Sequence, residues 1–355
     1  MDPPRVSIII RSMGRPELAE ALASIAKQSY ASIEVVVVDA TGGQHPPLPE
    51  TCGAFPVLVV DGAEPRSRPI AANAGLDAAR GDFLAFLDDD DLIEPVHIAG
   101  LLAELRKHPH YAVAYSHARE VVDGRGNIVR RAQSYSRMLL FQDCYFQMSS
   151  AVFRREILRS CRFDERLEVC EDWDFWLQAS AVSDFLVVPQ ETAVYRSALG
   201  RSGMGSTAGG NLDRTKYEHF RAQVAAKWQS EGERLSRNLE AAFDDAYALF
   251  ANGDHAGAAE AANTLLGRYP YHVRALSLGG TIAALRGKFD DAARHFRVAV
   301  DEIPEDPAAH FNLAQALQRL GRAADARAHY WQVVSLDPSH HLARTRLAAL
   351  DSQSR

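Results

Sequence analysis

The sequence predicts an α/β domain followed by a smaller, all-α domain of helical repeats. Three observations predict this order. Short β-branched runs alternate with helical patterns over the first 200 residues, as in a parallel sheet with helices on both faces. One apolar run, residues 83–87, ends at four consecutive carboxylates, Asp88 to Asp91. Beyond about residue 239, glycine, alanine and proline recur with a period of 34 residues.

The composition is that of an ordinary folded protein, with 47% hydrophobic and 24% charged residues among 355. The net charge of −7 argues against a nucleic-acid-binding protein, which would need a basic face. The four cysteines show no CxxC spacing, so we expect neither a zinc site nor a disulfide framework. The sequence shows no signal peptide and no membrane-spanning run. We therefore expect a cytoplasmic protein, with at most peripheral contact at the inner face of the membrane.

The elements of the first domain are short, and each strand is a run of apolar residues typical of a buried sheet. We expect strands over residues 6–10, 33–38, 57–60 and 83–87, and helices over 16–27 and 72–81. Gly81 is expected to end the second helix. The second strand delivers Asp39 to its carboxyl end. Ligands of open α/β sheets bind outside the carboxyl ends of the strands.

Asp88 to Asp91 form an acidic cluster at the end of the central strand. At a partly buried site, like charges repel by on the order of 1 kcal/mol or more per close pair. Such a cluster is tolerable where a divalent cation and a hydroxyl-rich ligand are bound, and hard oxygen ligands suit Mg²⁺ or Mn²⁺. The alternative is a solvated acidic turn that caps the helix after Pro95.

A second acidic pair, Glu171 and Asp172, lies in the segment CEDWDFWLQAS, residues 170–180. Helical periodicity places Trp173 and Trp176 on a buried face. The two acids are left at the helix start, where backbone N–H groups and the helix dipole stabilise a carboxylate. The alternative is that both acids only cap the helix.

Three separated blocks resemble family 2 glycosyltransferases of the GT-A fold: VSIIIRSMGRPELAEALASIAKQSYASIEVVVVDA, ANAGLDAARGDFLAFLDDDD and FDERLEVCEDWDFWLQA. The resemblance covers about residues 5–200. It implies a Rossmann-like nucleotide-diphospho-sugar transferase domain. The implied reaction is metal-dependent and inverting, and it moves a sugar from a nucleotide-diphosphate sugar, with a UDP-sugar as the expected donor. The expected acceptor is a surface-glycan precursor or a protein.

The resemblance also implies roles for individual residues. Asp90, with Asp88 beside it, is expected to hold Mn²⁺ or Mg²⁺. An inverting transferase needs a base for the acceptor hydroxyl; Asp172 is expected in that role, with Glu171 orienting the acceptor. The expected contacts to the nucleotide sugar are Arg11, Ser12, Asp39, Arg68, Asp88 and Asp89.

Two of these residues have simpler alternatives. Asp39 is also a typical turn former at a strand end, and Arg68 is also explained as a solvated surface arginine. The sequence departs from the family pattern where Ala40 follows Asp39, where Arg11 replaces the common proline, and where no histidine follows Tyr195 and Arg196. These departures bear on the base contacts and on metal affinity.

The C-terminal part carries three positions that recur every 34 residues, which is the tetratricopeptide signature. They are Gly253, Gly287 and Gly321; Ala258, Ala292 and Ala326; and Pro270, Pro304 and Pro338. We expect repeats over 239–272, 273–306 and 307–340, then a capping helix, within a domain of residues 239–355. Residues 1–228 form the predicted transferase domain and 229–238 the linker.

Several possibilities stay open for the repeats. One is binding of a peptide or protein partner, and a second is packing on the catalytic domain. The others are self-association and a scaffold role without a ligand. A rival to the enzyme is a tetratricopeptide adaptor whose transferase-like domain binds nucleotide sugar but has lost catalysis. The glycine-rich segment 199–211 is either a lid over the diphosphate or a linker. The run DGRGN at 123–127 predicts a hairpin turn.

Overall fold

The computed structural model describes residues 3–122, 126–130, 135–197 and 214–353. The chain divides into two compact units, the N-terminal unit of residues 1–232 and the C-terminal unit of 233–355. The predicted lid or linker at 199–211 lies outside the described residues, as does part of the turn at 123–127. Within the described ranges, no helix combines the length and the apolar character needed to cross a membrane.

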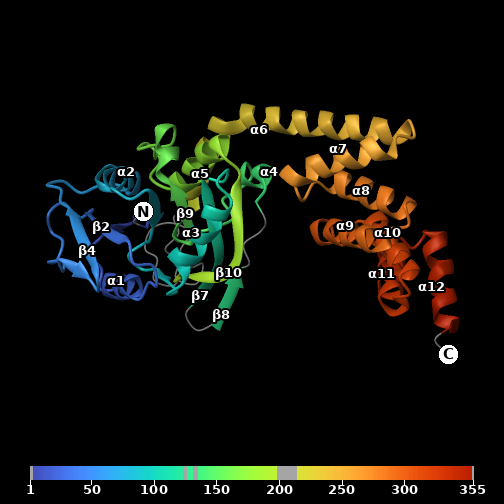
Figure 1. Cartoon of the computed structure of the whole chain (residues 1–355), viewed down its shortest axis with the longest axis horizontal. Helices are drawn as coiled ribbons and strands as arrows, with labels where there is room; N and C mark the ends of the chain where they lie inside the picture. Colours follow the sequence, from blue (N-terminus) through green and yellow to red (C-terminus); the bar gives the residue numbers. More distant parts are fainter. Residues whose placement is uncertain (1–2, 123–125, 131–134, 198–213, 354–355) are drawn as a thin grey trace. The chain divides into compact units, whose positions relative to one another are not determined.

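The N-terminal unit is built on a ten-stranded mixed sheet (Figure 1). The strands are β1 (Val6–Ser12), β2 (Ile33–Asp39), β3 (Thr51–Cys52), β4 (Phe55–Val60), β5 (Phe83–Phe86), β6 (Leu92–Ile93), β7 (Val113–Val122), β8 (Gly126–Arg130), β9 (Ala151–Arg154) and β10 (Phe185–Tyr195). Their order is β3-β4-β2-β1-β5-β9-β7-β10-β6, with β8 paired to β7.

The parallel arrangement predicted from the first half of the sequence is confirmed for four strands. β1 is parallel to both β2 and β5, and β2 is parallel to β4. The second half is mixed, because β9 runs antiparallel to both β5 and β7, whereas β10 is parallel to β7. Hydrophobic periodicity reports that a strand is buried but not its direction, so this part of the topology was not accessible from the sequence.

Helices cover both faces of the sheet, as the alternation of elements predicts. α1 (Leu18–Ala26) and α3 (His97–Lys107) pack on one face with Ile8 and Ile10 of β1. α2 (Arg68–Ala78) and α5 (Glu171–Val182) pack on the other face, with Ile9. Successive side chains of a strand point to opposite faces, so one apolar run supplies both cores. The α/β class is thereby confirmed.

The helix expected over 72–81 is displaced. α2 begins at Arg68, because Ser67 is extended and Pro69 occupies the first turn, and it ends at Ala78. Gly81 therefore does not end the helix. Its N–H donates to Ser7 Oγ at 2.7 Å, and a Cβ at this position would lie 2.6 Å from the Ser7 nitrogen. Gly81 is needed because two backbone segments approach closely.

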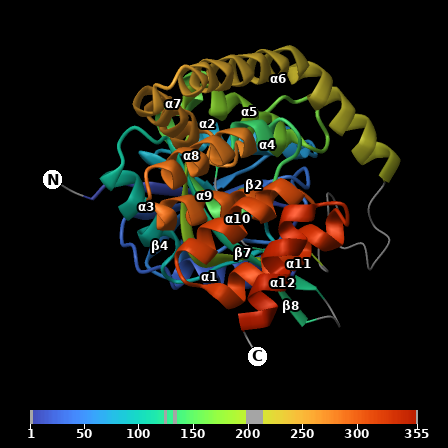
Figure 2. The same cartoon turned by 90° about the vertical axis from the view of Figure 1, so that its right-hand side faces the viewer.

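The C-terminal unit is all-α, as predicted (Figure 2). Its helices follow the second half of α6 (Arg214–Ala251) as α7 (His255–Arg268), α8 (Val273–Leu285), α9 (Phe289–Glu302), α10 (Pro307–Arg319), α11 (Ala323–Leu336) and α12 (His341–Gln353). Gly253, Gly287 and Gly321 have φ values of 84°, 73° and 75° and end the first helix of each pair. Phe296 and Tyr330, which occupy equivalent positions of successive repeats, are buried in the core of this unit.

The predicted linker is different in the structure. Residues 229–238 do not form a separate segment, because they continue α6 without a break. The boundary between the two units falls inside this stretch. The polar composition of residues 229–238 led to the prediction of a linker. An exposed helix is also polar on most of its surface, so composition alone does not distinguish the two.

Candidate active site

A pocket of about 220 Å³ lies at the carboxyl ends of β1 and β5. Its walls are the acidic cluster after β5, the first turn of α5, the loop of residues 143–149 and Tyr217 of α6. Seven carboxylates and four arginines line it, so its charge is negative on balance. The position agrees with the general rule for ligands of open α/β sheets.

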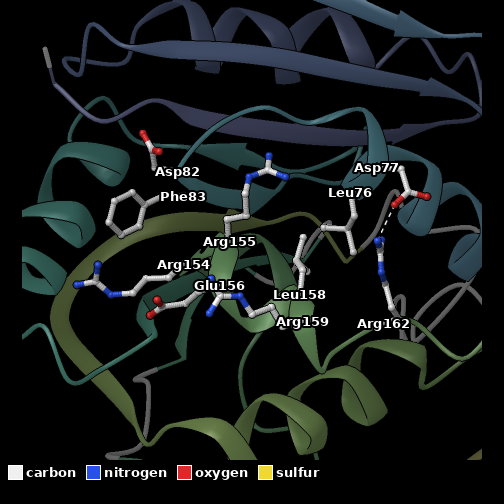
Figure 3. A pocket seen from close by; sticks show the side chains of 10 residues that line it. All are labelled: Leu76, Asp77, Asp82, Phe83, Arg154, Arg155, Glu156, Leu158, Arg159 and Arg162. Atoms are coloured by element: carbon white, nitrogen blue, oxygen red, sulfur yellow. Dashed lines mark ion pairs between the residues drawn. The ribbon is translucent and has the colours of Figure 1, made fainter.

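A larger hollow of about 610 Å³ lies at the opposite, amino end of β5 (Figure 3). Its arginines are largely committed to the protein itself. Arg154 and Arg155 donate to backbone carbonyl groups, and Arg162 pairs with Asp77 at 2.7 Å. The smaller pocket is therefore the candidate active site.

Two arginines join the two acidic blocks that the sequence singled out. Arg11 donates to Asp88 Oδ1 at 2.6 Å and to Glu171 Oε1 at 2.8 Å. Arg68 Nε donates to the same Glu171 oxygen at 2.8 Å, and its Nη2 lies 3.9 Å from Asp88 Oδ2. Arg68 is thus not a solvated surface arginine. The fold brings both blocks into one pocket.

These pairs keep Asp88 and Glu171 ionised. Burial acts to raise the pKa of Asp88, but Arg11 and Arg68 outweigh it and lower that pKa to about 2. The pKa of Glu171 is also lowered, because Arg68 and Arg11 outweigh the effect of burial. The Glu171 side chain is only 1% exposed and serves as the shared anion of two arginines. This places it as an anchor for the arginines rather than as a free carboxylate facing an acceptor.

Asp172 differs from its neighbour. Burial raises the pKa of Asp172 to about 6, and repulsion from Glu171 adds to the rise. Its Oδ1 accepts the N–H of Trp173 at 2.8 Å, and the residue lines the pocket. A carboxylate with a pKa close to the working pH is suited to take up a proton. Its position in the pocket and its raised pKa are compatible with the role of general base that the sequence predicts.

The remaining carboxylates of the cluster are buried rather than solvated. Asp89, Asp90 and Asp91 are 3%, 8% and 2% exposed, so the alternative of a solvated acidic turn is wrong. Burial, reinforced by Asp88, raises the pKa of Asp90 to about 6. Arg15 contacts Asp90 Oδ2 at 2.7 Å and Asp89 Oδ1 at 3.4 Å.

Asp91 has a structural role at the base of the pocket. It accepts hydrogen bonds from Ser149 Oγ at 2.9 Å and from the Arg196 N–H at 3.0 Å. These bonds tie the acidic cluster to the loop before β9 and to the end of β10. Burial raises the pKa of Asp91 well above its usual value.

Asp39 and Ser12 lie at the same strand edge but do not line the pocket. Asp39 Oδ1 accepts the N–H and the hydroxyl of Thr41, both at 2.6 Å, and Oδ2 accepts the N–H of Gly43 at 3.0 Å. Ser12 Oγ is bonded to His45 Nε2 at 2.7 Å. Both side chains shape the adjoining loop, which is the turn-forming role weighed for Asp39. Its neighbour Ala40 reaches the pocket wall.

The pocket residues that sequence reasoning missed include Arg15, Asp143 and Tyr217. Arg15 had a usable signal, since it follows the first strand directly in the loop at the ligand-binding edge. Asp143 lies in a loop with no recognisable pattern. Tyr217 lies on α6, far from the other blocks in sequence, and only the packing of that helix brings it to the pocket.

Both units of the chain are similar to known protein families. Residues 7–162 match the model of glycosyl transferase family 2, and residues 243–307 and 283–350 match models of tetratricopeptide repeats. The uncharacterised glycosyltransferase YwdF of Bacillus subtilis is 25% identical over 63% of this chain and 87% of its own length.

Two further relatives and one solved structure are similar to the chain. The amylovoran biosynthesis glycosyltransferase AmsB of Erwinia amylovora is 24% identical over 53% of this chain and 68% of its own. The succinoglycan biosynthesis protein ExoO of Rhizobium meliloti is 28% identical over 51% of this chain and 56% of its own. The crystal structure of S. aureus TarS 1–349 has a TM-score of 0.47 and 17% identity, over 98% of this chain and 88% of that one.

The chain is therefore a glycosyltransferase that carries a family 2 transferase domain over residues 7–162 and tetratricopeptide repeats over residues 243–350.

Proposed function

We propose that this glycosyltransferase moves a sugar from a UDP-sugar to a hydroxyl group of an acceptor, with inversion at the anomeric carbon. One observation carries the proposal. Asp172, with a pKa of about 6, lies in the same pocket as the strand-end acids and the arginines that a nucleoside diphosphate requires. A single base that takes the proton of the attacking hydroxyl is the requirement of an inverting transfer.

The arginines supply the contacts for the diphosphate in this proposal. Arg11 and Arg68 line the pocket, and Glu171 holds both guanidinium groups in place. Guanidinium groups recognise phosphate oxygens through paired N–H donors.

We also propose that the pocket binds a divalent cation. Asp88 and Asp90 present hard oxygen donors, and the surplus of carboxylates over arginines favours bound positive charge. No cluster of three or more His, Cys, Asp or Glu side chains is arranged for a metal within the described ranges. Two protein carboxylates plus diphosphate and water oxygens form a common set for Mg²⁺ or Mn²⁺. When bound, the cation would neutralise charge on the departing diphosphate.

The acceptor is proposed from the relatives. AmsB and ExoO are named for the biosynthesis of amylovoran and succinoglycan, so we propose a cell-surface polysaccharide precursor as acceptor. We propose that the enzyme meets such a precursor in the cytoplasm, at the inner face of the membrane. We propose that the tetratricopeptide repeats bind a protein partner or a second copy of the chain.

The experiment that tests the function is a panel of nucleotide sugars with release of the free nucleoside diphosphate as the readout. Turnover of a UDP-sugar supports the transferase. Binding of nucleotide sugars without turnover of any of them, with and without Mn²⁺, supports the adaptor whose domain has lost catalysis.

Asp90→Ala is expected to weaken the binding of UDP in the presence of Mn²⁺ or Mg²⁺. The substitution removes one of the two carboxylates proposed to hold the cation, and the diphosphate then loses a shared counter-ion. Calorimetry with UDP and metal measures the change, and Asp77→Ala is the matched control at the opposite end of the sheet. Equal affinity of Asp90→Ala and the wild type, with metal present, would contradict the metal assignment.

Removal of residues 239–355 is expected to leave a folded domain that slowly hydrolyses the donor. The N-terminal unit ends at residue 232, before the cut, and Glu231 of α6 accepts a hydrogen bond from Arg137 at 3.2 Å within that unit. Transfer to a macromolecular acceptor should fall more than donor hydrolysis if the repeats recruit that acceptor. Solubility, melting temperature and both activities are measured. An insoluble product would show that the repeats are structural support.

A further inference from the structure

One face of the first half of α6 packs along the N-terminal unit. Val224 is fully buried there, and Lys227 and Trp228 contact Asp174 of α5. Side chains three or four positions apart share a helix face. Tyr217 lies two turns ahead of Val224 on this face, and it lines the active-site pocket.

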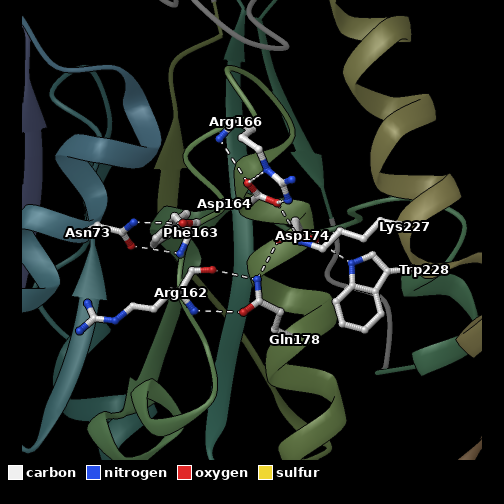
Figure 4. Close-up of polar contacts among 9 residues, drawn as sticks. All are labelled: Asn73, Arg162, Phe163, Asp164, Arg166, Asp174, Gln178, Lys227 and Trp228. Carbon is white, nitrogen blue, oxygen red and sulfur yellow. Dashed lines mark hydrogen bonds and ion pairs between the residues drawn. The ribbon is translucent and has the colours of Figure 1, made fainter.

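Asp174 anchors this face of α6 (Figure 4). Its side chain has no exposed surface, and it accepts from Lys227 Nζ at 2.9 Å and from Trp228 Nε1 at 2.7 Å. Lys227 also donates to Asp164 at 3.0 Å. Separating these groups would leave Asp174 charged and unpaired in the protein interior, which is costly. α6 is thereby held against the helix whose first turn carries Asp172.

A second contact fixes α6 one turn after Tyr217. Arg221 Nη2 donates to the carbonyl oxygen of Gln142 at 2.8 Å, and its guanidinium lies 5.6 Å from the ring centre of Trp173. Trp173 follows Asp172 directly in α5. Contacts with α5 and with the carbonyl group of Gln142 therefore hold Tyr217 in the pocket wall.

The Tyr217 side chain offers a hydroxyl group and an aromatic ring to a ligand in the pocket. It is half-buried, and its hydroxyl makes no hydrogen bond within the part of the chain that the structure describes. Burial raises the pKa of Tyr217 to about 12, with Asp143, Cys170 and Asp172 adding to the rise. The phenol therefore stays protonated, and it presents a free donor and an aromatic ring beside carboxylate acceptors.

We propose that Tyr217 contacts a pyranose ring at the Asp172 end of the pocket and thereby selects the sugar substrate. A pyranose has a C–H face that packs on an aromatic ring and hydroxyl groups that both donate and accept. Tyr217 supplies the aromatic ring and a donor, and Asp143 supplies an acceptor. The inference rests on the proposed function, because the ring belongs either to the donor sugar or to the acceptor that Asp172 activates.

The test compares Tyr217→Ala and Tyr217→Phe with His219→Ala, an exposed position of the same helix that does not line the pocket. Calorimetry with UDP, UDP-glucose and UDP-N-acetylglucosamine, with Mn²⁺, measures donor affinity. UDP release in the presence of methyl glucopyranoside and methyl N-acetylglucosaminide measures the use of acceptor probes. Melting temperatures are measured for every variant, because a purely structural tyrosine would change only these.

If the ring is that of the donor, Tyr217→Ala lowers the affinity for a UDP-sugar by roughly tenfold, the worth of an aromatic contact plus a hydrogen bond. The affinity for UDP itself then changes much less. If the ring is that of the acceptor, donor affinity is retained and the stimulation of UDP release by a glycoside falls by a similar factor. Tyr217→Phe keeps the ring, so its loss is smaller in either case.

The assignment is overturned if Tyr217→Ala binds UDP-sugars as tightly as the wild type and both methyl glycosides stimulate its UDP release as strongly as in the wild type. An equal loss in His219→Ala also overturns it. The proposed function fails by a different result, namely a wild type that neither binds UDP nor turns over a UDP-sugar.

Discussion

Asp172→Asn should lower turnover by on the order of 10²–10⁴, the usual contribution of a positioned general base. The substitution keeps the size of the side chain and its ability to accept the N–H of Trp173, but it removes the basic carboxylate. The affinity for UDP should barely change, because the proposed contacts to diphosphate and metal come from Arg11, Arg68 and the acidic cluster. Asparagine can accept the same N–H bond in the first turn of α5, so the melting temperature should stay near that of the wild type.

The pH dependence gives an independent readout of the same residue. A base works only when it is deprotonated, so the rate of the wild type should rise as the pH increases through about 6 and level off above it. This acidic limb should be absent in Asp172→Asn. Asp77→Asn is the control, since Asp77 is an exposed carboxylate at the other end of the sheet. Near-normal turnover of Asp172→Asn would remove Asp172 from the mechanism and leave it only the hydrogen bond to Trp173 in the first turn of α5.

Glu171→Gln should destabilise the N-terminal unit by roughly 3 kcal/mol, because removing one partner of a buried ion pair leaves the other charges uncompensated. Glu171 is 1% exposed and accepts from both Arg11 and Arg68 at 2.8 Å. The loss is measured as the shift of the thermal or denaturant unfolding transition of this unit. Turnover should fall as well, since both arginines lose the group that orients them.

The sign of the pH effect follows from the lowered pKa of Glu171. Its stabilisation is fully present above its unfolded pKa of about 4.3 and is lost as the pH falls through the folded pKa. The wild type and Glu171→Gln should therefore converge in stability in acid. Glu168→Gln is the control, because Glu168 is 58% exposed in its pair with Lys216 and such pairs contribute little. Equal stability of all three proteins at pH 7 would show that the arginines do not depend on Glu171.

Much of the fold could be predicted because buried strands and helices show hydrophobic patterns over short stretches of sequence. The β-branched runs that became β1 and β2 and the 34-residue repeat that became α7 to α11 each depend on neighbouring residues. The same holds for the two acidic blocks, which are recognisable at Asp88 and at Glu171 without knowledge of the fold. These features determined the fold class, the order of the domains and the identity of the candidate acids.

Tertiary structure decided how those acids behave. Glu171 and Asp172 are adjacent in sequence, yet the pKa of the first is lowered and that of the second is raised to about 6. The difference arises because Arg11 of β1 and Arg68 of α2 both bond directly to Glu171. For Asp172, burial and the charge of Glu171 outweigh the weaker influence of the same two arginines. No local pattern records which distant cations approach a carboxylate.

The same limit explains the features that the sequence did not reveal. Three features depend on contacts between segments far apart in the chain. They are the antiparallel direction of β9, the continuity of α6 through residues 229–238 and the position of Tyr217 in the pocket wall. Composition and periodicity report whether a residue is buried, and they do not report what it is buried against. The sequence by itself therefore determined the elements and their chemistry, whereas the packing of β1, α2, α5 and α6 around one pocket decided which residues act together.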